Sequence, residues 1–263
     1  MSPQMVEIEN ITEIRPRVLG EFHVEEFEPR TEAIARAFEW GKQVHAGQTR
    51  LSGEPYFETH CGWVASFVDN LVHKETWTIA ALLHDAVEDT GESLDQIRAL
   101  FPGEMGEEVA HIIDGLTKMS NPRDGSTREM DTLRKIAMFR DPAVFVIKLA
   151  DKSHNLMTLK YMPPGKQWQK ATEAIRAYGK LAGILNCYRW RRWIEDMAFP
   201  YAEPESYDTV KAKIDSDPRL NLNFIRYYLG ELGHLMEQEG IDGAVRFTVN
   251  GYWQAWDKLQ RMA

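Results

Sequence analysis

Cysteine is scarce in this chain of 263 residues, which contains only Cys61 and Cys187. The two lie far apart in the sequence, and no CxxC pair occurs. This scarcity argues against a disulfide framework and favours a reducing compartment. The lack of paired thiols also disfavours a structural zinc site.

Long apolar runs are missing as well. No stretch of roughly 18 apolar residues occurs, so no membrane span is expected. The N-terminus lacks the apolar core of a signal peptide. Together these absences predict a cytoplasmic protein with no membrane partner.

Basic residues are outnumbered, because 31 Lys and Arg stand against 40 Asp and Glu and give a formal net charge of −9. This balance argues against a nucleic-acid partner, which normally requires clustered Lys and Arg. It still allows an anionic small molecule. One bound cation and a few basic side chains can reverse the potential inside a cleft.

Apolar residues recur at helical spacing through most of the chain, which predicts an all-α fold. We expect three regions. A lead-in covers residues 1–29, a helical domain covers 30–210, and a partly helical C-terminal extension of open role covers 211–263. The extension is expected to pack on the domain or to make a subunit contact, so a homo-oligomer is left open.

Several helices are predicted from periodicity and end signals. Those that bear on the argument are expected at about residues 60–71, 75–89, 94–101, 142–159 and 222–239. The composition of residues 143–147 is also typical of a buried strand. We favour a helix there because Asp141 and Pro142 form a good helix start.

The segment HDAVED, residues 84–89, places one imidazole and three carboxylates within an arc of about 140° if it is helical. One interpretation is an exposed acidic helix end whose carboxylates are merely solvated. The other is a cluster that meets a cation, since charged groups on such an arc are costly without solvent or partners. The local spacing does not decide between them.

Two other positions favour the cation. His60 lies on the preceding helix and can supply a second imidazole, and Asp151 lies on a later helix with Lys148 and Asn155 on the same side. Two His and two Asp form a mixed nitrogen and oxygen set that suits Mn²⁺, Fe²⁺ or Zn²⁺ better than Ca²⁺. The alternative for Asp151 is an ion pair with a neighbouring lysine.

Several ordered blocks resemble the hydrolase domain of the RelA/SpoT homologue family, a branch of the HD superfamily. The blocks are VHAGQ (44–48), RLSGEPY (50–56), ALLHDAVEDT (81–90), DGLTK (114–118), IKLADKSHN (147–155) and EDMAF (195–199). The resemblance covers about residues 30–210. It implies an HD-domain helical bundle of roughly ten helices and a metal-dependent (p)ppGpp 3′-pyrophosphohydrolase that yields GDP or GTP.

The resemblance also implies roles for individual residues. The metal ligands, with Mn²⁺ the usual ion, are His60, His84, Asp85 and Asp151. The acidic pair that orients and deprotonates the attacking water is Glu88 and Asp89. Nucleotide binding falls to Arg50, which stacks on the base, and to Ser52, Asn155 and Thr158, while Lys148 stabilises developing charge. His154 is expected to have a structural or supporting role.

Three departures from the family pattern affect these expectations. Phe57, Glu58 and Thr59 separate Tyr56 from the ligand His60, whereas the family usually has two residues there. Leu51 stands where Lys is common, and Met157 lies in a segment where Arg is frequent. The last two reduce positive charge near an anionic ligand and leave the substrate open.

The chain ends before a synthetase domain would fit, so it resembles a stand-alone small alarmone hydrolase. Two alternatives stay open. The same fold can act on an adenine alarmone such as ppApp or as an NADPH phosphatase. A non-catalytic nucleotide-binding or toxin-neutralising module is the other alternative, although such a module need not keep the acidic and imidazole cluster.

Overall fold

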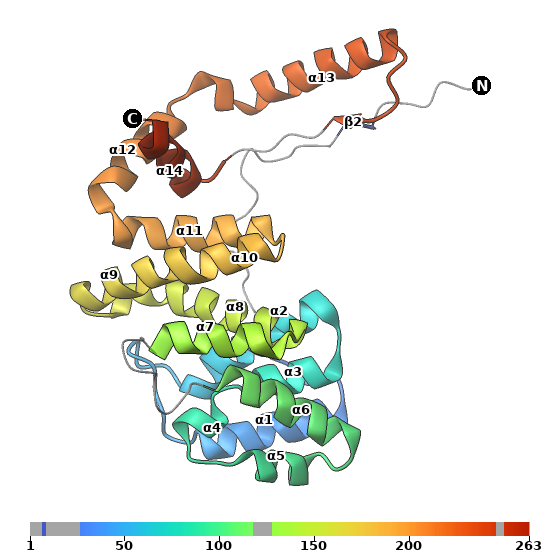
Figure 1. The fold of residues 1–263 in the computed structure, drawn as a ribbon, viewed down its shortest axis with the longest axis vertical. Helices are drawn as coiled ribbons and strands as arrows, with labels where there is room; N and C mark the ends of the chain where they lie inside the picture. The colour runs from blue at the N-terminus through green and yellow to red at the C-terminus, as the bar shows by residue number, and fades with distance from the viewer. Residues whose placement is uncertain (1–6, 9–26, 118–127, 246–249, 263) are drawn as a thin grey trace. The chain divides into compact units, whose positions relative to one another are not determined.

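The structure is a computed structural model, and it describes residues 7–8, 27–117, 128–245 and 250–262. The fold is all-α, as the sequence predicts (Figure 1). Among the described residues, the exception is a parallel pair of two-residue strands, β1 (Glu7–Ile8) and β2 (Ala244–Val245). Residues 246–249 (RFTV), whose composition also suits a short strand, lie outside the described residues.

The chain divides into two compact units. One comprises residues 23–167, and the other comprises residues 1–22 and 168–263. The division falls inside the region 30–210 that the sequence predicts as one domain. It lies inside α9 (Pro164–Glu173), a few residues after Met162 and Pro163, where the preceding helical segment ends.

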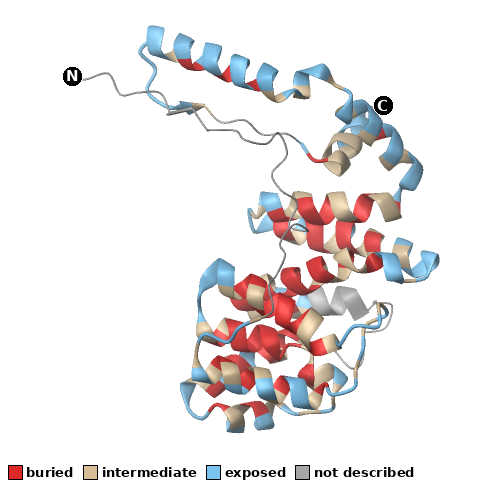
Figure 2. Ribbon diagram, turned by 180° about the vertical axis from the view of Figure 1, so that it is seen from behind, coloured by how far each residue is buried: buried red, intermediate tan, exposed pale blue. Residues whose placement is uncertain are grey.

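The unit of residues 23–167 is built around α3 (Glu75–Leu82), which is buried on nearly every side (Figure 2). A helix that is apolar all round belongs in a core. α3 packs against α1 (Glu32–Val44), α2 (Gly62–Val72), α6 (Glu104–Leu116) and α8 (Pro142–Met157). The remaining elements are η2 (Phe57–Cys61), α4 (Ala86–Asp89), α5 (Leu94–Leu100), α7 (Arg128–Phe139) and η3 (Leu159–Tyr161).

Two predicted helix starts are confirmed. The Asp141 side chain accepts a 2.8 Å hydrogen bond from the Ala143 amide, and Pro142 occupies the first turn of α8. Residues 143–147 are therefore helical rather than a strand. Ser93 and Gln96 form a reciprocal capping box at the start of α5.

The single helix predicted over residues 75–89 is wrong at its centre. α3 ends at Leu82, a turn covers residues 83–85, and α4 begins at Ala86. Nδ1 of His84 lies 2.8 Å from the Ala81 carbonyl oxygen. That oxygen is the one that the residue 85 amide would use in a continuous helix, so the side chain competes with the helical bond.

The second unit is centred on α11 (Tyr188–Ala202). It packs against η4 (Ala174–Gly179), α10 (Lys180–Ile184), α12 (Pro204–Asp215) and α14 (Tyr252–Met262). The predicted helix at 222–239 is confirmed as α13 (Leu222–Gln238), which follows η5 (Pro218–Leu220) and contacts β1 and β2. Within the described residues, no helix combines the length and apolar character needed to cross a membrane.

Candidate metal centre and nucleotide pocket

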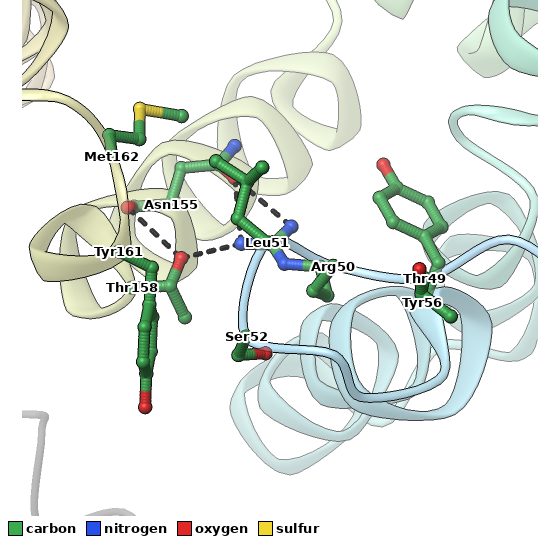
Figure 3. A pocket seen from close by; sticks show the side chains of 9 residues that line it. All are labelled: Thr49, Arg50, Leu51, Ser52, Tyr56, Asn155, Thr158, Tyr161 and Met162. Atoms are coloured by element: carbon green, nitrogen blue, oxygen red, sulfur yellow. Dashed lines mark hydrogen bonds between the residues drawn. The ribbon is translucent and has the colours of Figure 1, made fainter.

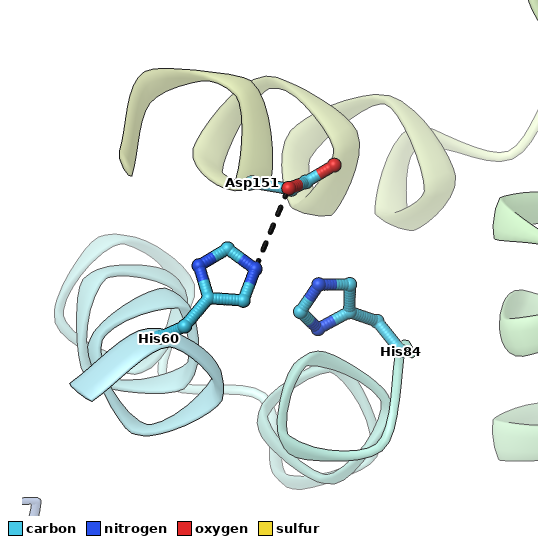
Figure 4. A group of neighbouring side chains, drawn as sticks. All are labelled: His60, His84 and Asp151. Carbon is cyan, nitrogen blue, oxygen red and sulfur yellow. Dashed lines mark ion pairs between the residues drawn. The ribbon is translucent and has the colours of Figure 1, made fainter. Parts of the chain in front are cut away.

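Four predicted ligands approach one another inside the unit of residues 23–167. Nε2 of His60 lies 3.5 Å from Oδ1 of Asp151 and 3.4 Å from Oδ2 of Asp85. The same Asp85 oxygen lies 2.9 Å from Nε2 of His84. Ligand atoms of His60, His84 and Asp151 all lie within 4.8 Å of one another (Figure 4).

Nε2 of His84 is the most informative atom of this cluster. The Ala81 carbonyl can only accept, so Nδ1 carries the proton of the neutral ring and Nε2 carries the lone pair. Nε2 is buried and receives no hydrogen bond; it faces Oδ2 of Asp85 at 2.9 Å, and an ionised carboxylate cannot donate to it. A buried lone pair without a donor is costly, and a divalent cation between two imidazoles and two carboxylates would satisfy it. The residues therefore fit a divalent metal ion.

The charge states of the cluster also suit a cation. Burial lowers the pKa of His60. At His84 burial acts in the same direction, but the Asp85 carboxylate outweighs it and raises the pKa. Burial opposes ionisation of Asp85, yet the two imidazoles hold its pKa well below the usual range. At Asp151 burial is again outweighed, here by neighbouring lysines that lower the pKa. Both carboxylates are ionised near neutral pH, as a metal ligand must be.

Cys61 is also close enough to join a ligand group, with His84 and Asp85. Burial, and after it the Asp85 charge, raise the pKa of the Cys61 thiol well above its ordinary value. A protonated thiol is a poor ligand, since the thiolate is the form that binds metals. The nitrogen and oxygen set remains the better match.

Two side chains outside the predicted ligand set, His154 and Tyr56, contact the predicted ligands. Nδ1 of His60 lies 2.8 Å from Nδ1 of His154 in a buried contact. Burial, and after it the His60 charge, lower the pKa of His154 to about 2, so this ring stays neutral. The Tyr56 hydroxyl donates to Oδ2 of Asp85 at 2.6 Å. Burial, and after it Asp85, raise the pKa of Tyr56 far above its usual range, so the hydroxyl keeps its proton.

The predicted acidic pair lies on α4, just beyond the ligands. The Asp89 amide donates to the Asp85 carbonyl at 2.9 Å, which puts Asp89 one turn further along. Glu88 is half-buried and Asp89 is exposed. Lys148 is buried, and its Nζ lies 3.3 Å from Oδ2 of Asp151. Lys148 therefore contacts Asp151, a predicted metal ligand, and its role in substrate binding stays a prediction.

Four of the five predicted substrate-binding residues line a cavity of about 200 Å³ (Figure 3). Its lining residues are Thr49, Arg50, Leu51, Ser52, Tyr56, Asn155, Thr158, Tyr161 and Met162.

Hydrogen bonds fix the Arg50 guanidinium in this cavity. Both of its terminal nitrogens lie 3.3 Å from Oδ1 of Asn155, and one donates to the Thr158 hydroxyl at 2.5 Å. The Asn155 amide donates in turn to Oδ1 of Asp151 at 2.5 Å. Asn155 therefore links Arg50 in the cavity to Asp151, one of the predicted metal ligands.

The family model described as HD domain matches residues 37–187. The chain belongs to the HD domain family. This match includes all the residues predicted to bind metal or substrate.

The curated relatives of this HD domain chain carry RelA/SpoT-type names. A "Probable GTP pyrophosphokinase" of Mycobacterium leprae is 35% identical over 238 residues, which cover 89% of this chain and 30% of the relative. A "Probable guanosine-3′,5′-bis(diphosphate) 3′-pyrophosphohydrolase" of Synechocystis sp. is 38% identical over 211 residues, covering 76% of this chain and 27% of the relative. The predicted resemblance is confirmed, and the chain spans less than a third of the length of these two relatives.

One solved structure supports the HD fold. It is that of a metazoan ortholog of SpoT, which its description says hydrolyses ppGpp. The similarity has a TM-score of 0.54 at 23% identity and covers 67% of this chain and 98% of that chain. At this identity the likeness concerns the fold alone.

The extra residue before His60 is accommodated by the helix type. η2 is a π-helix over Phe57–Cys61, in which the Gly62 amide donates to the Phe57 carbonyl five residues earlier. A π-turn holds one residue more than an α-turn. The ring of Phe57 packs where Gly41 of α1 leaves room, since a Cβ there would lie 2.3 Å from it. The inserted residue is thus absorbed while His60 still reaches the cluster.

Sequence reasoning did not give Tyr56 a role of its own. Its only signal is its place directly after Pro55 at the end of a matched block. His154 was expected to have a structural or supporting role, and its contact with His60 fits that expectation. Both residues act through distances between separate elements, which sequence spacing does not contain.

Proposed function

We propose that this protein is a divalent-metal-dependent 3′-pyrophosphohydrolase of ppGpp and pppGpp that releases pyrophosphate and leaves GDP or GTP. The observation that carries the proposal is the convergence of His60, His84, Asp85 and Asp151 on one buried place, where no donor faces Nε2 of His84. The adjoining cavity, with Arg50 held in place, supplies a site for the nucleotide. The names of the relatives support this choice of substrate.

We further propose that the ion is Mn²⁺. Imidazole and carboxylate ligands without thiolate suit a first-row divalent metal of higher coordination number. Four protein ligands would leave positions for water and substrate.

The reaction assigns separate tasks to the side chains. A divalent cation at the ligands supplies Lewis acidity and lowers the pKa of water. Water forms a bond to the 3′-attached phosphorus, the bond from that phosphorus to the 3′ oxygen breaks, and the 3′ oxygen takes up a proton. Glu88 and Asp89 accept and relay the proton of the attacking water. Lys148 adds positive charge, and Arg50 with Ser52, Asn155 and Thr158 holds the nucleotide.

Leu51 favours a second candidate class of substrate. Leu51 lines the cavity and is 70% exposed, where the family commonly has Lys. The missing Lys would remove one contact to a phosphate or to the base, so ppApp hydrolysis or an NADPH phosphatase activity is the second candidate. A cytoplasmic location, a homo-oligomer and the extents of the domains remain predictions of the sequence.

A substrate panel tests the proposal. Purified protein is incubated with Mn²⁺ and ppGpp, pppGpp, ppApp or NADPH, and products are separated by ion-exchange chromatography. Release of pyrophosphate and GDP from ppGpp, absent in an Asp85→Ala variant, is the expected result. Phosphate release from NADPH alone would replace the proposal by the second candidate. Nucleotide binding without turnover of any compound would indicate a non-catalytic module.

A further inference from the structure

The loop before η2 folds back on itself and fixes Arg50 relative to Tyr56. The Arg50 amide donates to the Glu54 carbonyl at 2.9 Å, and the Tyr56 amide donates to the Gln48 carbonyl at 3.0 Å. Thr49 and Pro55 form an antiparallel bridge between these bonds. These backbone contacts therefore fix the position of Arg50 relative to Tyr56.

Tyr56 meets a different functional group at each end. Its hydroxyl donates to Oδ2 of Asp85, the same oxygen that faces the His84 and His60 nitrogens. Its ring lies 5.7 Å from the Arg50 guanidinium carbon and lines the nucleotide cavity (Figure 3). One side chain thus touches both a metal ligand and the base-binding residue.

Each contact has a separate physical effect. A carboxylate oxygen can accept a hydrogen bond and still bind a cation, so the hydroxyl fixes the direction in which Asp85 presents its charge. An aromatic ring attracts a guanidinium, which is itself planar, and can hold it in place. A flat guanidinium backed on one side can stack on a base with the other side.

We propose that Tyr56 is a positioning residue for both sites: its hydroxyl orients Asp85 toward the metal, and its ring supports Arg50 in the nucleotide cavity. The inference rests on the proposed function, because it requires a metal and a nucleotide at these two places. It adds a residue to which the family resemblance assigned no role.

Two substitutions separate the two effects. Tyr56→Phe removes the hydroxyl and keeps the ring, whereas Tyr56→Met removes both and keeps apolar bulk at the position. Tyr227→Phe makes the same chemical change as the first on an exposed tyrosine of α13 and is the control. Calorimetry measures the Kd of Mn²⁺ alone and, in separate titrations, the Kd of GDP for the metal-free protein. Circular dichroism checks that each variant is folded.

For Tyr56→Phe we expect a rise in the Mn²⁺ Kd of roughly tenfold and an unchanged GDP Kd. For Tyr56→Met we expect the same rise for Mn²⁺ together with a rise in the GDP Kd of roughly fivefold. Tyr227→Phe should match the wild type in both. An unchanged Mn²⁺ Kd in Tyr56→Phe would overturn the role of the hydroxyl. Equal GDP Kd values in the two Tyr56 variants would overturn the role of the ring. If Tyr56→Met does not fold, Tyr56→Phe by itself still tests the role of the hydroxyl in Mn²⁺ binding.

The outcome is distinguishable from failure of the proposed function. If the wild type does not hydrolyse ppGpp but Tyr56→Phe weakens Mn²⁺ binding, the positioning role stands and the substrate is wrong. If the wild type hydrolyses ppGpp and Tyr56→Phe binds Mn²⁺ normally, only the inference is wrong. A wild type that binds neither Mn²⁺ nor GDP overturns both.

Discussion

His84 and Asp85 are neighbours in the sequence, yet their side chains meet at one place. On a regular helix, adjacent side chains diverge by about 100°. The turn at residues 83–85 removes this constraint and brings Nε2 of His84 to 2.9 Å from Oδ2 of Asp85. At the scale of single residues, the site therefore depends on a local interruption of the helix.

Glu88 gives the first prediction at this scale. Glu88→Gln should lower kcat for ppGpp by roughly 10²–10⁴-fold, because an amide cannot accept the proton of the attacking water. The Mn²⁺ Kd should stay unchanged, since Glu88 is not among the converging ligands. Steady-state kinetics and calorimetry measure the two quantities. Glu92→Gln is the control, and full activity of Glu88→Gln would remove Glu88 from the mechanism.

His154 gives the second. When Nε2 of His60 binds a cation, Nδ1 carries the ring proton and His154 is its acceptor. His154→Phe keeps a ring of similar shape but leaves that buried donor unpaired. The Mn²⁺ Kd should rise by roughly 10–100-fold, as measured by calorimetry. His234→Phe on exposed α13 should leave it unchanged. Wild-type affinity in folded His154→Phe would mean that the contact has no orienting role.

At the scale of elements, α8 and η2 show how single helices position several parts of the site. Asp151, Asn155 and Thr158 are spaced by four and three residues, so they share one side of α8 or its C-cap. One helix thus presents both a predicted metal ligand and two residues that line the cavity. η2 presents His60 through a π-turn that no α-helical wheel predicts.

The π-turn leads to a prediction for a deletion. Removing Thr59 should convert η2 to an α-turn, restore the usual family spacing and preserve Mn²⁺ binding, because the π-turn contains one extra residue. Calorimetry with Mn²⁺ provides the measurement. Removing Ala65, which is buried in α2, should instead shift every later residue of that helix and abolish binding. Loss of binding on removal of Thr59 would show that the π-turn is itself required.

At the scale of the whole molecule, all the candidate site residues lie in the unit of residues 23–167. This unit buries several titratable groups together: His60, His84, His154 and Asp151. Their burial ties the stability of the fold to pH. A bound cation would increase that dependence, because the ligands must be deprotonated to hold it and protons compete with it in acid.

The metal-free protein should therefore lose stability in acid. The pKa values of His60 and His154 are lowered in the fold, so below about pH 6.5 the unfolded chain binds protons that these rings refuse. The pKa of His84 is raised instead, so this ring binds a proton in the folded protein as well and does not add to the loss of stability in acid. Stability should fall with pH by roughly 1.4 kcal/mol per pH unit for each excess proton of the unfolded chain.

Urea unfolding of the metal-free protein between pH 7.5 and pH 5 measures this slope. His154→Phe should make it shallower by the contribution of one ring, and His234→Phe should not alter it. A slope of zero, or stability that rises in acid, would contradict the burial of neutral rings. Added Mn²⁺ should raise the unfolding midpoint most strongly at the upper end of this range.

The sequence alone predicted the all-α fold, the starts of α5 and α8, the resemblance to RelA/SpoT homologues, the four residues of the cluster and four of those that line the cavity. These follow from periodicity, capping side chains and ordered blocks, which are local properties of the chain. The tertiary structure decided the rest. The break at residues 83–85, the π-turn before His60 and the double contact of Tyr56 depend on distances between elements that pack together only in the folded chain. Helical spacing specifies which face a side chain occupies, but packing specifies what that face meets.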